Sequence, residues 1–108
     1  MAWILLFIAG LFEVGFATCL GKAKETSGSE QLWWLAGFIV ALAISMSLLY
    51  RAAQSLPIGT AYAVWTGIGA VGTVLVGILL FREPTDFWRL FFLFALIASL
   101  VGLKAVTP

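Results

Sequence analysis

The chain consists of four long apolar runs separated by short polar or charged segments. The runs cover residues 2–20, 32–50, 57–81 and 87–106. A bilayer core of about 30 Å takes roughly 20 helical residues, so each run is long enough to cross a membrane once. Hydrophobic residues make up 63% of the chain and charged residues only 10%, unlike a soluble domain. We therefore predict an all-α membrane protein with four transmembrane helices in a single domain, residues 1–108.

The composition also excludes several kinds of active site. The chain has no His and one Cys, so it lacks the usual ligand sets of zinc and iron sites and any Cys-His or Ser-His catalytic pair. Its net charge of +1 gives no basic surplus for nucleic acid. We expect no enzyme activity, no metal, no cofactor and no nucleic-acid partner.

Glu13 is the one charged residue that lies well inside an apolar run rather than in a loop or at a run's end. An acidic side chain in the middle of a membrane helix costs about 2.5–3.5 kcal/mol on insertion scales. Because burial disfavours the ionised carboxylate, such a group can exchange a proton for a cationic ligand. The alternative is a protonated Glu13 that only hydrogen-bonds neighbouring helices. The functional interpretation makes Glu13 a proton or cation site within a cavity.

Helical spacing gathers small and aromatic residues around Glu13. Gly10 and Phe16 lie three residues before and after it, on or near the same face. In the third run, Tyr62 and Trp65 belong to a second face that mixes aromatic rings with hydroxyl groups. A tyrosine can donate to a carboxylate, and a tryptophan ring can line a cation site. We predict that these residues line the pocket.

Small and polar residues in the other runs suggest helix contacts. Ser45 and Ser47 are the only polar groups deep in the second run, and either can bond its own helix backbone. The last run carries a narrow stripe of small residues, typical of a helix-pairing seam, at Ala95, Ser99 and Gly102. Four helices of this size can hardly enclose a two-sided cavity. We therefore expect a dimer in which one Glu13 from each subunit faces a shared pocket.

The third run, of about 25 residues, is longer than one crossing needs. It also contains several glycines, and we expect a bend near Gly67 and Gly69. Basic residues divide four to two between the two sides of the membrane. This small excess sets the membrane orientation only weakly.

One motif is more specific than these patterns. Residues 56–69 read Leu-Pro-Ile-Gly-Thr-Ala-Tyr-Ala-Val-Trp-Thr-Gly-Ile-Gly. With Glu13 and the Gly102-Leu103-Lys104 sequence, the whole chain resembles the small multidrug resistance family. The resemblance implies a proton-coupled exporter of the bacterial inner membrane that works as an antiparallel dimer. The first three helices would form the pocket, and the fourth would form much of the dimer contact. Thr66, which follows Trp65, resembles the guanidinium exporter subtype.

The resemblance also implies roles for single residues. Glu13 would bind a proton or the substrate in competition, and Ser45 would hydrogen-bond its carboxylate. Tyr62 and Trp65 would shape the pocket, and the Gly67-Ile68-Gly69 segment would be a hinge.

Two features depart from the guanidinium exporter pattern. Phe16 stands where that subtype usually carries Trp, and the first loop, residues 21–31, is long and polar. A quaternary-ammonium exporter of the same family therefore stays an alternative to export of small guanidinium-type cations. The second subunit is either an identical chain or a paralogous one. An alternative from another class is a structural membrane subunit that transports nothing.

Overall fold

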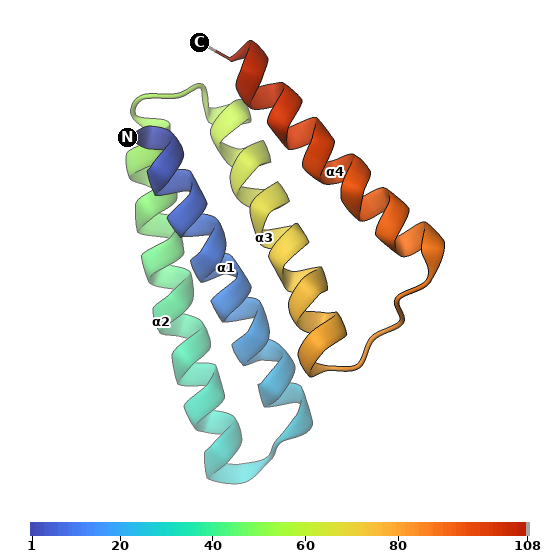
Figure 1. The fold of residues 1–108 in the computed structure, drawn as a ribbon. Coiled ribbons are helices and arrows are strands. Elements are labelled where there is room, and N and C mark those ends of the chain that lie inside the picture. Colours follow the sequence, from blue (N-terminus) through green and yellow to red (C-terminus); the bar gives the residue numbers. More distant parts are fainter. Residues whose placement is uncertain (108) are drawn as a thin grey trace.

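The computed structural model describes residues 1–107; Pro108, the last residue of the predicted domain, lies outside the described residues. Each of its four helices has at least 20 residues and a window of mean hydropathy of 2.0 or 2.1. At about 1.5 Å per residue, each is long enough to cross a bilayer core. This confirms the predicted all-α membrane fold. The helices, drawn in Figure 1, are α1 (Ala2–Glu25), α2 (Gly28–Ala53), α3 (Ile58–Leu80) and α4 (Phe87–Val106).

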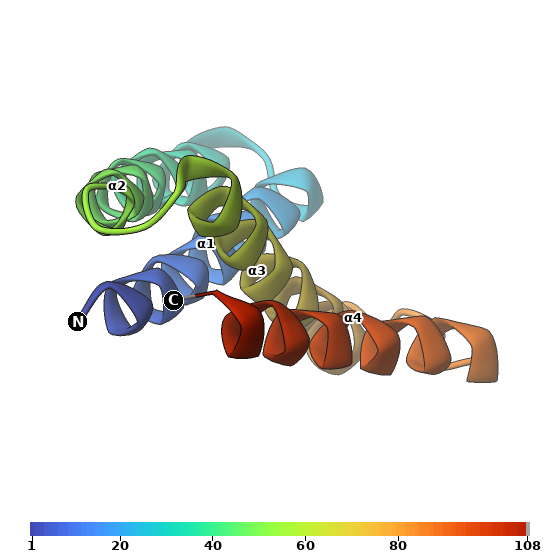
Figure 2. The same cartoon turned by 90° about the horizontal axis from the view of Figure 1, so that it is seen from above.

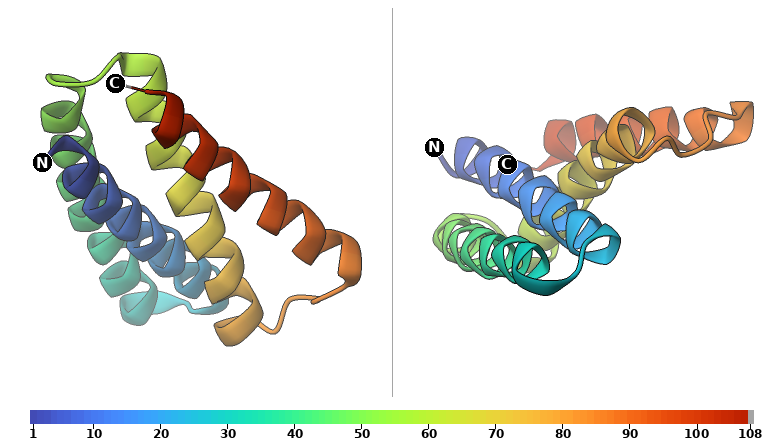
Figure 3. Two further views of the ribbon diagram at one scale, coloured as in Figure 1. Left: turned by 45° about the horizontal axis from the view of Figure 1, so that its top comes forward. Right: turned by 90° about the horizontal axis from the view of Figure 1, so that it is seen from below.

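The helices run alternately up and down, so the two ends of the described chain lie at the same end of the molecule (Figure 1). Seen from above, α1 lies between α2 and α3, while α4 extends away on the side opposite α2 (Figure 2). The view from below shows the same order (Figure 3). Within residues 1–107, the backbone of α4 approaches only that of α3. The fourth helix is therefore the most peripheral.

The first connection is shorter than the polar segment of the sequence predicts. Residues 21–31 were expected to form a polar loop, but α1 continues to Glu25 and α2 begins at Gly28. The hydroxyl of Thr26 donates to the carbonyl of Lys22 at 3.0 Å, and the side-chain amide of Gln31 donates to the carbonyl of Ala23 at 3.0 Å. Gly28 has a φ of 68°, a conformation that glycine adopts without steric cost. Local caps and a glycine turn thus extend both helices beyond their apolar segments.

The other predicted boundaries agree more closely with the structure. The second helix continues to Ala53 instead of ending at residue 50, and α3 lies within one residue of its predicted range at each end. Pro57 precedes α3, in a position where its missing N–H costs no helical hydrogen bond. The predicted and observed ranges of α4 coincide.

The interior of a single chain is small. Its main cluster of buried hydrophobic residues joins α1, α2 and α3 at the end of the molecule that carries the N-terminus. The cluster includes Leu6, Leu49 and Val64. By contrast, only 6% of the most apolar window of α4 is buried, against 28% for α3. The molecule extends over 48 × 35 × 16 Å, which makes it a flattened body. Most apolar side chains of α4 therefore face outward.

Candidate functional site

The carboxyl group of Glu13 lies at the contact between α1 and α3. A Cβ built on Gly69 would overlap Cγ, Cδ and Oε1 of Glu13, so the side chain rests directly on the α3 backbone. Two similar contacts flank this one: Ile68 packs onto Gly10, and Val14 packs onto Gly72. Glycines on both helices thus let α1 and α3 approach closely, as small residues do in membrane helix pairs.

The Oε1 atom of Glu13 is buried and has no hydrogen-bond partner. Among residues 1–107 it is the only buried side-chain nitrogen or oxygen in this condition. An unsatisfied buried polar atom costs about 1–3 kcal/mol, and a bare buried charge costs more. A proton or a bound cation would reduce this cost, which makes Glu13 the chemically distinctive group of the chain.

A chain of two buried hydrogen bonds connects three helices next to Glu13. The indole Nε1–H of Trp65 donates to Oγ of Ser45 at 2.8 Å, and the Ser45 hydroxyl donates to the carbonyl of Ala9 at 2.7 Å. In a helix, the carbonyl of Ala9 also accepts the backbone N–H of Glu13, four residues later. These bonds fix the turn of α1 that carries the carboxylate.

This arrangement corrects one prediction. The family resemblance implied that Ser45 hydrogen-bonds the Glu13 carboxylate, but the Ser45 hydroxyl donates to the Ala9 carbonyl instead. A hydroxyl has a single proton, so it cannot donate to both acceptors. Ser45 therefore contacts the backbone of α1 and receives the Trp65 N–H.

The other predicted pocket residues take different positions. Trp65 is buried, whereas the neighbouring Tyr62 is 55% exposed, with the two ring centroids 5.4 Å apart. Phe16 packs edge-on against Phe38 of α2, at 5.7 Å between centroids. Gly10 is buried against α3. The structure thus brings Gly10, Glu13, Ser45 and Trp65 together on three helices, while Phe16 packs on α2 and Tyr62 faces outward.

The glycines predicted as a hinge lie within an uninterrupted α3. A side chain at Gly67 would overlap Leu100 of α4, whereas one at Gly69 would overlap Glu13 of α1. The two positions therefore let α3 approach a different neighbour on each side. Their role as a hinge stays a prediction. The contact of Gly69 with Glu13 was not predicted, although the cluster of small residues in the third run was its signal.

The predicted seam on α4 faces outward. Ala95, Ser99 and Gly102 are all exposed. In the described chain, no neighbouring atom lies within 4 Å of a Cβ built on Gly102. The stripe is therefore free for a second molecule, and its use as a dimer contact stays a prediction. Within residues 1–107, no three His, Cys, Asp or Glu side chains gather as metal ligands would.

Comparison with known proteins adds independent information. A family model described as Small Multidrug Resistance protein matches residues 1–97. The guanidinium exporter of Salmonella typhimurium is 49% identical over 104 residues, which are 96% of each chain. The guanidinium exporter of Escherichia coli is 47% identical over 107 residues, 99% of each chain. The probable guanidinium efflux system subunit GdnD of Bacillus licheniformis is 43% identical over 107 residues, 99% of this chain and 100% of that one.

Proposed function

The chain belongs to the small multidrug resistance family, and from this premise we propose that it is a proton-coupled antiporter for small guanidinium-type cations. It is a multi-pass protein of the bacterial inner membrane. Relatives of 43–49% identity over nearly the full length carry guanidinium export or efflux in their names. This similarity supports guanidinium and substituted guanidines as the substrates.

The observation that carries the proposal is the buried Oε1 atom of Glu13, which lacks a partner. In an apolar surrounding a bare carboxylate is unfavourable, so it binds either a proton or a cation. When the two compete for one group, release of the cation accompanies protonation. The cation and the proton would therefore cross the membrane in opposite directions.

The chemistry of the carboxylate also favours a planar cation with several N–H donors. Guanidinium groups form two parallel hydrogen bonds with a carboxylate, which a quaternary ammonium cannot do. We propose that Trp65, one turn before Gly69 on α3, lines the pocket with its ring. Tyr62 faces outward in a single chain, so its hydroxyl would take part only in a pocket shared with a second subunit. We propose that Gly10, Phe16 and Ser45 also line the pocket around Glu13.

The shape of the chain supports a dimer. Its fourth helix approaches only α3 in the described chain, and just 6% of the most apolar window of α4 is buried, which leaves a large apolar surface for a second subunit. The exposed stripe on α4 offers a surface for a second subunit, and we propose an antiparallel pair in which both Glu13 side chains face one pocket. The word "subunit" in the name of one relative supports pairing with a paralogous chain as the alternative to an identical one. The mass and composition of the purified oligomer would separate the two.

A second candidate is export of quaternary-ammonium cations. Phe16, which packs against Phe38, offers no N–H donor one turn from Glu13, and this favours an apolar substrate more than an indole would. Reconstituted protein should be tested with guanidinium, methylguanidinium and tetrapropylammonium under a proton gradient. Transport of the first two supports the main proposal, and transport of the third alone supports the alternative. Failure to transport any of them refutes both.

A structural membrane subunit is the alternative from another class. Glu13→Gln separates it from a transporter because the amide still forms hydrogen bonds but cannot exchange a proton. We expect this variant to assemble normally and to lose coupled transport. If transport persists in Glu13→Gln, Glu13 does not couple the two ions.

A further inference from the structure

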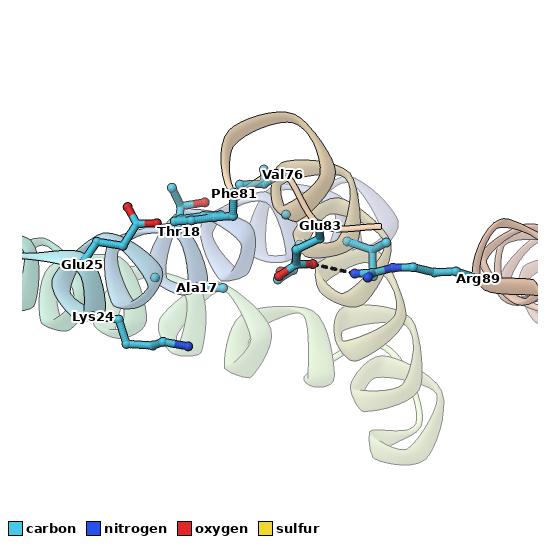
Figure 4. Close-up of a pocket in the computed structure, with 12 residues that line it drawn as sticks. Ala17, Thr18, Lys24, Glu25, Val76, Phe81, Glu83 and Arg89 are labelled. Atoms are coloured by element: carbon cyan, nitrogen blue, oxygen red, sulfur yellow. Dashed lines mark hydrogen bonds and ion pairs between the residues drawn. The ribbon is translucent and has the colours of Figure 1, made fainter. Parts of the chain in front are cut away.

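A cavity of about 430 Å³ lies between α1 and α3, at the end where both helices terminate. Figure 4 shows its charged side chains: Lys24 and Glu25 come from α1, and Glu83 and Arg89 come from the α3–α4 connection and the start of α4. The cavity carries two side chains of each sign at its rim. With Lys22, whose ammonium lies against the ring of Phe81, three basic and two acidic side chains stand at the cavity, so an entering cation has to bind at one of the two carboxylates.

The cavity begins close to Glu13. Its lining residues include Ala17, one turn after Glu13 on α1, and Thr73, one turn after Gly69 on α3. Four residues of helix correspond to about 6 Å. Val14, the residue after Glu13, packs onto Gly72, the residue before Thr73. The cavity thus extends from one turn beyond the proposed cation site to the ends of the helices.

Glu83 is held in place at the rim. Its backbone N–H donates to the carbonyl of Gly77 at 3.1 Å, and its carboxylate rests on Gly77 where any other residue would place a Cβ. The carboxylate accepts a hydrogen bond from Nη2 of Arg89 (Figure 4). The side chains of Arg89 and Glu83 are 30% and 44% exposed. Exposed ion pairs of this kind are weak, so another cation can replace Arg89.

We propose that Glu83 is an outer binding site for the transported cation, and that a substrate guanidinium replaces the guanidinium of Arg89 there. This inference rests on the proposed guanidinium export. Arg89 presents the same planar group of donors as the substrate, so the geometry of Glu83 already suits such a cation. The ring of Phe81, which lines the cavity and has the Lys22 ammonium 5.5 Å from its centroid, adds an aromatic face for a cation.

The proposal predicts opposite effects for the two partners of the ion pair. Glu83→Gln removes the site, so the KM for guanidinium should rise about threefold to tenfold. Arg89→Gln removes the tethered competitor, so the KM should fall about threefold. Arg89→Lys, which loses the planar donors, should change the KM in the same direction as Arg89→Gln. Glu30→Gln, at an exposed acidic residue outside the cavity, is the matched control and should leave the KM unchanged.

The experiment measures initial rates of guanidinium-dependent proton movement in proteoliposomes at several guanidinium concentrations. A pair that merely fastens α4 to α3 would give the two Gln variants the same loss of maximal rate, with no opposite change in KM. That result, or an unchanged KM in both, overturns the outer site. If Glu83→Gln does not assemble, the two Arg89 variants decide, since a KM that stays constant or rises in both refutes competition. If the unmodified protein transports no guanidinium, the proposed function itself fails.

Discussion

The carboxyl group of Glu13 is seated on the backbone of Gly69, in the place where any other residue would carry its Cβ. One contact therefore holds α1 against α3 and also positions the only acidic side chain in the apolar runs. The Oε1 atom buried there has no hydrogen-bond partner in the described chain. Any cation that reaches Glu13 must be accommodated at this helix contact, which ties binding to the packing of α1 and α3.

The first prediction concerns Gly69→Ala. The added methyl group would overlap the carboxyl group, so either α1 shifts or the side chain turns away. Overpacking of this kind costs about 1–3 kcal/mol of stability, and we expect a large loss of transport together with a lower melting temperature. Gly59→Ala on the same helix is the control, because its Cβ would meet open space. Normal transport by Gly69→Ala would show that the Glu13 contact is dispensable.

The second prediction concerns the hydrogen bonds between Trp65, Ser45 and Ala9. Ser45→Ala leaves the buried indole N–H without an acceptor, which should destabilise the protein by about 1–3 kcal/mol. Trp65→Phe removes the donor but leaves the Ser45 hydroxyl bonded to Ala9. Thermal unfolding of the two single variants and the double variant would measure the coupling. Strictly additive effects would contradict a connected network.

The third prediction concerns the end of α3. Arg82 has a φ of 55°, and the next residue, Glu83, donates its N–H to the Gly77 carbonyl. Glycine is the preferred residue at this left-handed position after a helix. Arg82→Gly should therefore raise stability by about 1 kcal/mol, whereas Arg82→Lys should not. A lower melting temperature for the glycine variant than for the lysine variant would argue against this cap.

The fourth prediction concerns the stripe on α4. Gly102→Trp should leave the fold of one chain intact because open space surrounds this position, but it should weaken a dimer formed through the stripe. Phe94→Trp, at a position 68% exposed on another side of the helix, is the control. The molar mass in detergent would report the outcome. An undisturbed oligomer in Gly102→Trp would place the contact elsewhere.

The fifth prediction concerns competition at Glu13. If a proton and guanidinium share this carboxylate, the KM for guanidinium should rise as the pH falls, because protonated Glu13 cannot bind the cation. Rates in proteoliposomes at several pH values, with equal pH on both sides, would measure this relationship. A KM that is independent of pH would contradict shared binding. Glu30→Gln, exposed at the start of α2, should retain the dependence.

Hydropathy alone was sufficient to predict the number of helices and the range of α4, since a membrane-spanning helix needs a fixed length of apolar chain. Hydropathy was insufficient to predict where the helices end within residues 21–31. Helical backbone continues there through polar residues, and it ends where caps and the positive φ of Gly28 permit a turn. Such local bonds depend on geometry that an apolar pattern does not contain.

The prediction that Glu13 is the distinctive side chain of the apolar runs likewise came from the sequence, because a carboxylate in an apolar run is costly wherever it lies. The surroundings of Glu13 did not. The hydroxyl of Ser45 could reach either the carboxylate or a carbonyl, and only the relative placement of α1 and α2 directs it to Ala9. Gly69 is distant in sequence from Glu13, the residue whose carboxyl group it contacts. Sequence thus determined which residues are costly to bury, whereas helix packing decided which partners they meet, because hydrogen bonds and close contacts depend on ångström-scale placement.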